Sequence, residues 1–122
     1  MALLESGEMY LETILVLASR METVRAIDIS EHMGFSKPSV SRALSRLRAE
    51  AYVSVSESGA IVFTEAGRAV AEKIYARHTL LTELLEKLGV SADTAREDAC
   101  RIEHDISDET FAALQRHLQH IT

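Results

Sequence analysis

Residues 25–50 constrain the fold more than any other stretch, because helix start and stop signals occur there at close spacing. A short apolar-periodic segment ends at Gly34, and Ser36 together with Pro38, the single proline of the chain, opens a second segment. Serine at the N-cap and proline in the first turn mark the start of a helix. The stretch therefore predicts two helices joined by a tight turn, as in a helix-turn-helix unit.

The second of these helices separates an apolar stripe from a basic, serine-rich surface. Val40, Leu44 and Leu47 recur at helical spacing and form the stripe. In a helix-turn-helix the second helix enters the major groove, where small hydroxyl side chains permit close approach and cations contact phosphates. The residues expected to contact DNA are Ser36, Lys37, Pro38, Ser39, Ser41, Arg42 and Arg46. The alternative is an ordinary helical hairpin with a solvated cationic surface.

Charge is distributed unevenly along the chain. The formal net charge of −6 counts against nonspecific binding to phosphates. Residues 36–50 nevertheless carry a net charge of +3, because four cations there accompany one acid, whereas residues 1–35 carry −4 and residues 78–122 carry −5. This local reversal favours the DNA-binding interpretation of the second helix.

Residues 52–63 change to strand-forming chemistry, with valine, isoleucine and phenylalanine on both sides of the turn sequence Glu57-Ser58-Gly59. Such a pattern predicts a small β-hairpin. A hairpin directly after the second helix makes the unit a winged helix-turn-helix. We expect this DNA-binding domain to occupy residues 1–70.

The remaining residues, 71–122, are predicted to be helical. A long helix begins after Thr64 and ends at Gly89, and shorter helices begin at Ser91 and Ser107. A chain of 122 residues cannot readily bury all of their apolar stripes, so we expect a homodimer interface here. The predicted fold class is mainly α, with an N-terminal winged helix-turn-helix and a C-terminal helical dimerisation and metal-binding domain.

Three types of metal ligand occur within residues 99–105. Cys100, Glu103 and His104 supply a thiolate, a carboxylate and an imidazole at offsets of three and four, which share one face of a helix. The alternative is a small buried cysteine beside a solvated Glu-His pair. As the single cysteine, Cys100 cannot form an internal disulfide, which suits a reducing compartment.

Three further residues are candidate ligands with structural alternatives. Met9 and Glu12 are three apart on the first predicted helix and can point toward a shared site. Core packing is the alternative for Met9, and solvation is the alternative for Glu12. His78 lies on the apolar face of the long helix, where a hydrogen-bonded core histidine is the alternative to a ligand.

Together these motifs resemble the metal-dependent repressors typified by the diphtheria toxin repressor and the manganese transport regulator. The resemblance covers nearly the whole chain and rests on Glu8-Met9-Tyr10-Leu11-Glu12, Ser36-Lys37-Pro38-Ser39-Val40, Arg77-His78, Glu97-Asp98-Ala99-Cys100-Arg101-Ile102-Glu103-His104 and Ser107-Asp108-Glu109. It implies a regulatory metal site of the iron-responsive type, made of Met9, Cys100, Glu103 and His104. In the manganese-responsive branch, carboxylates occupy the positions of Met9 and Cys100.

The resemblance also implies a second metal site. Glu12 and His78 match the second site of the manganese regulator, to which the positions of Cys100 and Glu103 also contribute. We therefore expect two metals per subunit, bridged by Glu103 or Cys100.

Other positions depart from the long iron-dependent repressors. Those proteins place a carboxylate where Thr82 stands and a histidine where Arg96 stands. The chain ends at Thr122, which is similar to the short form without an SH3-like domain. Sulfur ligands favour Fe(II), Co(II), Ni(II) or Zn(II) over the hard ion Mn(II), and the family resemblance indicates Fe(II).

These inferences predict a metal-activated DNA-binding repressor, Fe(II)-responsive, that controls metal-uptake genes. The homodimer is expected to bind a double-stranded operator with two-fold related half-sites. The alternatives are a thiol-redox-sensing winged-helix repressor that uses Cys100, a Mn(II)-responsive regulator, or a small metal-dependent hydrolase, although no catalytic motif is evident. No apolar run approaches the ~20 residues that span a bilayer, and the N-terminus does not resemble a signal peptide, so we expect a cytoplasmic protein without a membrane partner.

Overall fold

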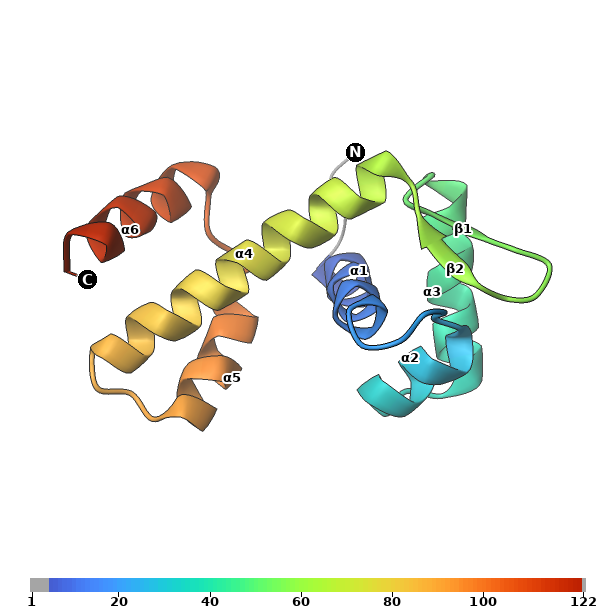
Figure 1. The fold of residues 1–122 in the computed structure, drawn as a ribbon, viewed down its shortest axis with the longest axis horizontal. Coiled ribbons are helices and arrows are strands. Elements are labelled where there is room, and N and C mark those ends of the chain that lie inside the picture. Colours follow the sequence, from blue (N-terminus) through green and yellow to red (C-terminus); the bar gives the residue numbers. More distant parts are fainter. Residues whose placement is uncertain (1–4, 122) are drawn as a thin grey trace. The chain divides into compact units, whose positions relative to one another are not determined.

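The computed structural model describes residues 5–121 and is mainly helical, with one small hairpin (Figure 1). In chain order the elements are α1 (Glu5–Ala18), α2 (Ala26–Met33), α3 (Lys37–Ala49), β1 (Val53–Val55), β2 (Ile61–Phe63), α4 (Glu65–Lys87), α5 (Ala92–Ile102) and α6 (Asp108–Ile121). The predicted fold class is confirmed. None of the described helices is long and apolar enough to cross a membrane.

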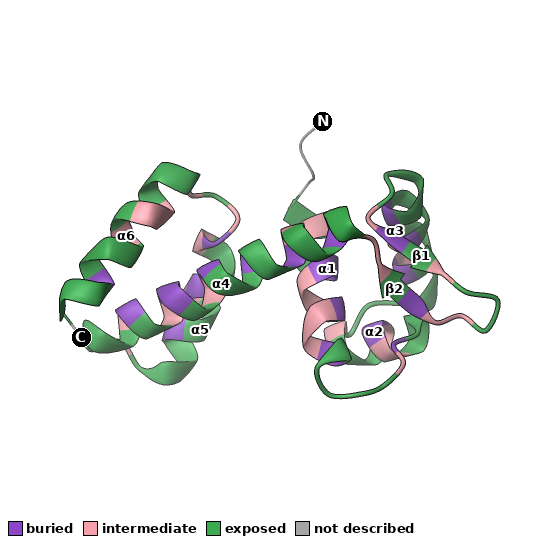
Figure 2. Cartoon of the chain, turned by 45° about the horizontal axis from the view of Figure 1, so that its top comes forward, coloured by how far each residue is buried: buried purple, intermediate pink, exposed green. Residues whose placement is uncertain are grey.

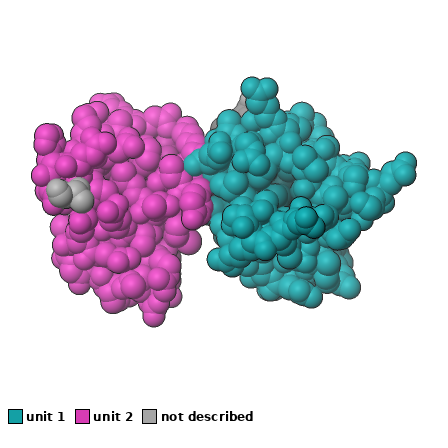
Figure 3. Space-filling view, in the orientation of Figure 1, with its two compact units in different colours: residues 1–72 teal, residues 73–122 magenta. Residues whose placement is uncertain are grey.

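The chain divides into two compact units, residues 1–72 and residues 73–122, which are coloured separately in Figure 3. Unit 1 contains α1 to α3, the hairpin and the first turns of α4. Unit 2 contains the rest of α4 together with α5 and α6. The long helix α4 thus contributes residues to both units.

The core of unit 1 is apolar and receives side chains from each of its elements. Leu11, Ile29 and Val40 are completely buried, and Figure 2 shows buried positions alternating with exposed ones along the helices. The predicted stripe on α3 is confirmed, because Leu44 and Leu47 join Val40 in this core. Burial of one apolar face per helix is what holds such short helices in place.

The turn between α2 and α3 forms as its residues predict. Gly34 ends α2 with φ 73°, a left-handed conformation that glycine adopts without a steric penalty. Ser36 caps α3, where its Oγ accepts a hydrogen bond from the Ser39 N–H at 3.3 Å, and Pro38 lies in the first turn. Both helix boundaries are therefore encoded locally.

The hairpin packs closely against the start of α4. Strands β1 and β2 are antiparallel, and Val24 adds an isolated bridge to Ile61. Thr64 caps α4 through a hydrogen bond from the Gly67 N–H to its Oγ1 at 3.1 Å. A Cβ on Gly67 would lie 1.8 Å from the Tyr52 carbonyl oxygen, so only glycine fits at this contact.

Unit 2 has a smaller apolar cluster. Leu80 and Leu84 of α4 are buried with Leu118 of α6, and two partly buried residues of α6, Phe111 and Leu114, pack against them. Ser107 caps α6, because its Oγ accepts a hydrogen bond from the Thr110 N–H at 3.1 Å. Of the apolar stripe predicted for α6, Phe111, Leu114 and Leu118 pack in this cluster, whereas Ile121 is 46% exposed.

Candidate metal centre and DNA-binding surface

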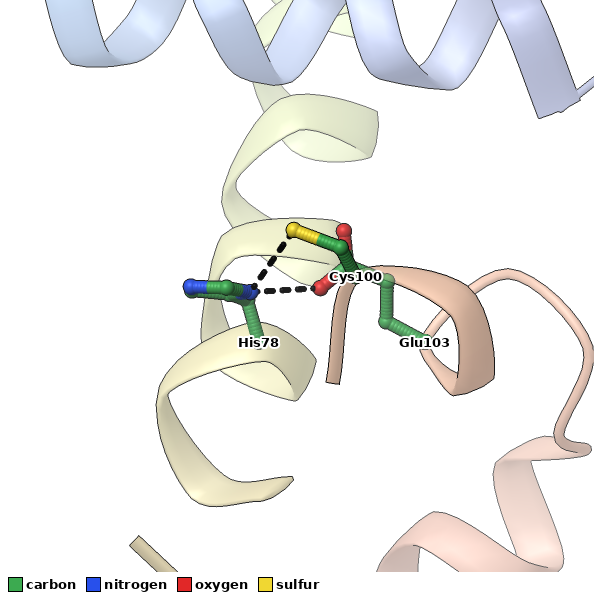
Figure 4. A group of neighbouring side chains, drawn as sticks. All are labelled: His78, Cys100 and Glu103. Atoms are coloured by element: carbon green, nitrogen blue, oxygen red, sulfur yellow. Dashed lines mark hydrogen bonds and ion pairs between the residues drawn. The ribbon is translucent and has the colours of Figure 1, made fainter. Parts of the chain in front are cut away.

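Three of the predicted ligands converge in unit 2. His78 of α4 lies beside Cys100 of α5 and Glu103, and Figure 4 shows the three side chains pointing toward one another. The His78 Nδ1 is 2.9 Å from Glu103 Oε2 and 3.7 Å from Cys100 Sγ. One ligand atom from each residue lies within 4.8 Å of the other two. Such a spacing allows all three to coordinate one ion.

The carboxylate of Glu103 is the most unusual group of this cluster. Its side chain is 0% exposed, and Oε1 accepts no hydrogen bond from any described residue. His104 Nε2 lies 3.3 Å from Oε1 and could form an ion pair with it if protonated, but the contact lacks hydrogen-bond geometry. A buried acceptor without a donor is costly, because the group has lost its water. The alternative of a solvated Glu-His pair does not describe Glu103.

The donor set fits a divalent transition metal. A thiolate, imidazoles and a carboxylate are the ligands that Zn(II), Fe(II) and related ions take in proteins. A cation bound by this cluster would compensate the buried charge of Glu103. Coordination needs Cys100 as a thiolate and the histidines neutral, so metal binding would release protons and weaken in acid.

The predicted location of two ligands on one helix needs a correction. Helix α5 ends at Ile102, and Glu103 and His104 lie in the turn that follows. Glu103 nevertheless keeps helical angles, φ −58° and ψ −26°, and its N–H donates to the Ala99 carbonyl at 3.0 Å. The offset of three from Cys100 therefore still places both side chains on one side.

Arg77 is a residue that the sequence analysis did not assign to the site. It is 5% exposed, and its Nη1 donates to the carbonyl oxygens of Glu103 at 3.1 Å and Ile106 at 2.6 Å. Its Nη2 donates to Asp108 Oδ1 at 2.5 Å. The signal was an arginine on a helical line that is otherwise apolar, three positions after Ile74.

Two neighbouring cations lower the pKa of Asp108 below its ordinary value. The Lys73 Nζ lies 2.9 Å from its Oδ1, and Arg77 Nη2 contacts the same oxygen. The hydrogen bond from Lys73, followed by that from Arg77, lowers the pKa of Asp108. Asp108 therefore stays ionised into acid and keeps its two cationic partners.

The two remaining candidate ligands belong to unit 1. Met9 and Glu12 are both on α1, with Met9 39% exposed and Glu12 partly buried. This exposure argues against core packing as the role of Met9.

The predicted DNA-contacting residues form an exposed surface on α3. Lys37, Arg42 and Arg46 are exposed, and Ser39 is partly buried with its Oγ 3.4 Å from Arg42 Nη2. Ser36, Pro38 and Ser41 are exposed as well. The cations therefore remain available for phosphate contacts while the opposite face of α3 holds the core.

The hairpin is held to the helix-turn-helix by Arg25. Its Nε donates to the Ser58 carbonyl oxygen in the hairpin turn at 3.2 Å. Arg25 also forms the N-cap of α2, so the turn of the wing and the start of α2 share one residue.

Comparison with known proteins places each half of the chain in a described domain. Residues 2–61 match the N-terminal DNA-binding domain of iron-dependent repressors, and residues 64–122 match their metal-binding and dimerisation domain. The transcriptional regulator MntR of Escherichia coli O6:H1 is 31% identical over 106 residues, which are 87% of this chain and 68% of MntR. The diphtheria toxin repressor of Corynebacterium diphtheriae is 31% identical over 121 residues, which are 98% of this chain and 54% of that repressor.

A solved structure supports the same assignment. The manganese regulator SloR superposes with a TM-score of 0.81 at 31% identity over 93% of this chain and 53% of its own. The chain thus spans about half the length of SloR and of the diphtheria toxin repressor. The two domain matches and these relatives lead to the same assignment. The chain belongs to the family of metal-dependent transcriptional repressors that includes MntR and the diphtheria toxin repressor, which are not enzymes.

Proposed function

We propose that the chain is an Fe(II)-responsive repressor of metal-uptake genes. The observation that carries this proposal is the buried Glu103 carboxylate. Its Oε1 accepts no hydrogen bond from the described residues, its Oε2 lies 2.9 Å from His78 Nδ1, and His78, Cys100 and Glu103 place one ligand atom each within 4.8 Å of one another. Such a site is polar, desolvated and rich in metal donors, which favours a cation over an empty cluster.

The proposed regulatory site follows the resemblance to the family. Its ligands are Met9, Cys100, Glu103 and His104. Glu12 and His78 would hold a second ion together with Cys100 or Glu103, so that each subunit would take two metals. The position of His78 Nδ1, close to both Cys100 Sγ and Glu103 Oε2, supports this sharing.

Ligand chemistry supports Fe(II) as the activating ion. A thiolate and a thioether are softer donors than the carboxylates and water that suit Mn(II). Raw affinity would rank Zn(II) and Ni(II) higher, so geometry and availability in the cell must favour iron. A Mn(II)-responsive regulator is the alternative. SloR is described as a manganese regulator, and the transcriptional regulator MntR is also similar to this chain.

The proposed mechanism connects residues of the DNA-binding domain, predicted as 1–70, with residues of the metal-binding domain, 71–122. Met9, Cys100, Glu103 and His104 would hold the ion, which would supply a cross-link between residues of the two domains. Restricting the motion of the two recognition helices in a homodimer favours the spacing of successive major grooves, roughly 34 Å. Lys37, Arg42 and Arg46 then contact phosphates of two-fold related half-sites.

A matched pair of variants tests the proposal. Glu103→Gln removes the buried carboxylate, whereas Glu97→Gln changes an exposed acid of α5. Reduced protein is titrated anaerobically with Fe(II), Mn(II) and Zn(II) and scored by binding to duplexes that the metal-loaded protein selects from a random pool. We expect metal-dependent DNA binding in the parent and in Glu97→Gln and none in Glu103→Gln. Metal-dependent binding that survives in Glu103→Gln would refute the site.

Metal preference has its own test. Met9→Asp combined with Cys100→Glu exchanges both sulfur donors for oxygen donors and should shift activation from Fe(II) toward Mn(II). An unchanged metal ranking would mean that these two side chains do not select the ion.

A thiol-sensing repressor is the second candidate, favoured by the exposed Cys100 thiol 3.7 Å from His78 Nδ1. An adjacent imidazole can promote thiolate formation and hence oxidation. Cys100→Ser would abolish regulation in either case, but Glu103→Gln would spare a thiol switch. DNA binding that responds to peroxide in Glu103→Gln would favour this candidate.

A further inference from the structure

Arg77 is a buried cation next to the proposed metal ligand Glu103, and it is not a ligand itself. Its guanidinium spans three acceptors, the carbonyl oxygens of Glu103 and Ile106 and the carboxylate of Asp108. We propose that Arg77 is a positioning residue that holds the turn after α5 and thereby sets the Glu103 carboxylate opposite His78. The inference rests on the proposed metal-binding function of these residues.

The turn after α5 needs such a partner. The last carbonyls of a helix have no intrahelical donor and carry partial negative charge. Glu103 is the C-cap of α5, so its carbonyl is one of these, and Ile106 lies in the connection between α5 and α6. Arg77 supplies both hydrogen bonds from one nitrogen, Nη1, at 3.1 Å and 2.6 Å. The backbone that carries the Glu103 side chain is therefore held by a charged donor.

Neighbouring residues of α4 hold the two halves of Glu103. Arg77 contacts its main-chain oxygen, and His78 contacts its side-chain Oε2 at 2.9 Å. Two adjacent residues of one helix thus contact both the backbone and the side chain of Glu103. Because outer-shell partners orient ligands, loss of the Arg77 contacts should weaken metal binding without removing a ligand.

The same guanidinium connects the centre to α6. Asp108 is the first residue of α6, and Arg77 lies over the Phe111 ring, 5.6 Å from its centroid. Phe111 packs against the apolar cluster of Leu80, Leu84 and Leu118. Arg77 therefore links the turn that carries Glu103 to a helix of the domain matched to dimerisation.

Two matched pairs of variants test this role. Asp108→Asn weakens the anchor of Arg77 at a side chain that is 73% exposed, and Glu109→Gln is its control on the same turn of α6. Arg77→Gln removes the clamp, and Arg96→Gln, an exposed arginine of α5, is its control. Each protein is titrated with Co(II), and binding is followed by the ligand-field absorption spectrum. Metal-free protein is followed by amide hydrogen exchange.

We expect Arg77→Gln to weaken Co(II) binding by about 10- to 100-fold and to change the spectrum, with a smaller loss in Asp108→Asn and none in either control. Arg77→Lys should be intermediate, because an ammonium keeps the charge but lacks the fork that spans the acceptors. In metal-free Arg77→Gln, the Asp105 amide, which donates within the turn, should exchange faster.

Other results would overturn the proposal. If the parent binds Co(II) and both Arg77→Gln and Asp108→Asn match their controls in affinity and spectrum, Arg77 does not position the ligands. Full affinity in Arg77→Lys would show that charge alone suffices and would overturn positioning too. If Arg77→Gln does not fold, Asp108→Asn decides between the same outcomes. A parent that binds no Co(II) would instead refute the metal-binding function on which the inference rests.

Discussion

Each of the two units is stabilised internally by a different kind of side chain. Unit 1 buries an apolar cluster to which each of its helices and strands contributes. Unit 2 has a smaller apolar cluster, and both buried charged residues among the described residues, Arg77 and Glu103, belong to it. Apolar burial stabilises a fold in any ionic condition, whereas buried charges need partners. Unit 1 should therefore fold without metal, and the geometry of unit 2 should depend on its ligands.

The largest expected effect is a cavity in unit 1. Leu11 is completely buried, so Leu11→Ala should lower the free energy of unfolding by about 3 kcal/mol. Ile27→Ala, at a side chain of α2 that is 41% exposed, should cost less than about 1 kcal/mol and is the control. Urea denaturation of metal-free protein measures both. Equal costs would contradict the comparison, because unit 1 would not depend on its core.

Metal should act on unit 2. Co(II) at 100 times its dissociation constant should stabilise the protein by about 2.7 kcal/mol, since the ion binds only the folded state. Hydrogen exchange should locate this protection in α5 and the turn at Glu103 more than in α2 and α3. Glu103→Gln should lose it. Protection of equal size in α2 and α3 would break the distinction between the units.

Exposed cations of unit 1 should affect DNA binding and nothing else. Arg42→Gln or Arg46→Gln should each reduce the slope of log K against log salt by about 0.9, because one phosphate contact is lost. Metal affinity and unfolding free energy should not change. Arg20→Gln, an exposed cation outside α3, is the control. If both α3 variants keep the parent slope on a selected duplex, the recognition helix has been misassigned.

The smallest effect concerns acid. Lys73 and Arg77 lower the pKa of Asp108, so its contribution to stability is present above the ordinary value of 3.8 and is lost as the pH falls through the lowered value. Parent stability should therefore fall more steeply below about pH 4 than that of Asp108→Asn. Urea midpoints between neutral pH and pH 3 measure this, with Glu109→Gln as the control. Parallel curves would indicate that the exposed ion pair contributes nothing.

The sequence by itself determined the helix-turn-helix, the hairpin and most helix boundaries. Gly34, Ser36, Thr64 and Ser107 act on backbone groups within four residues, so their signals are readable without knowing the rest of the fold. The same holds for the candidate ligands of residues 100–104, whose spacing is local. Local chemistry was sufficient wherever the contact was local.

Only the tertiary structure decided that Glu103 is buried, that α5 ends before it, and that Arg77 belongs to the centre. His78 and Glu103 are 25 residues apart, and Arg77 and Asp108 are 31 apart. Spacing along one helix cannot say which charge is removed from water, because burial depends on which other helix covers it. A charged residue in an apolar stripe marks such a place, but its partners come from the packing of α4 against the turn between α5 and α6.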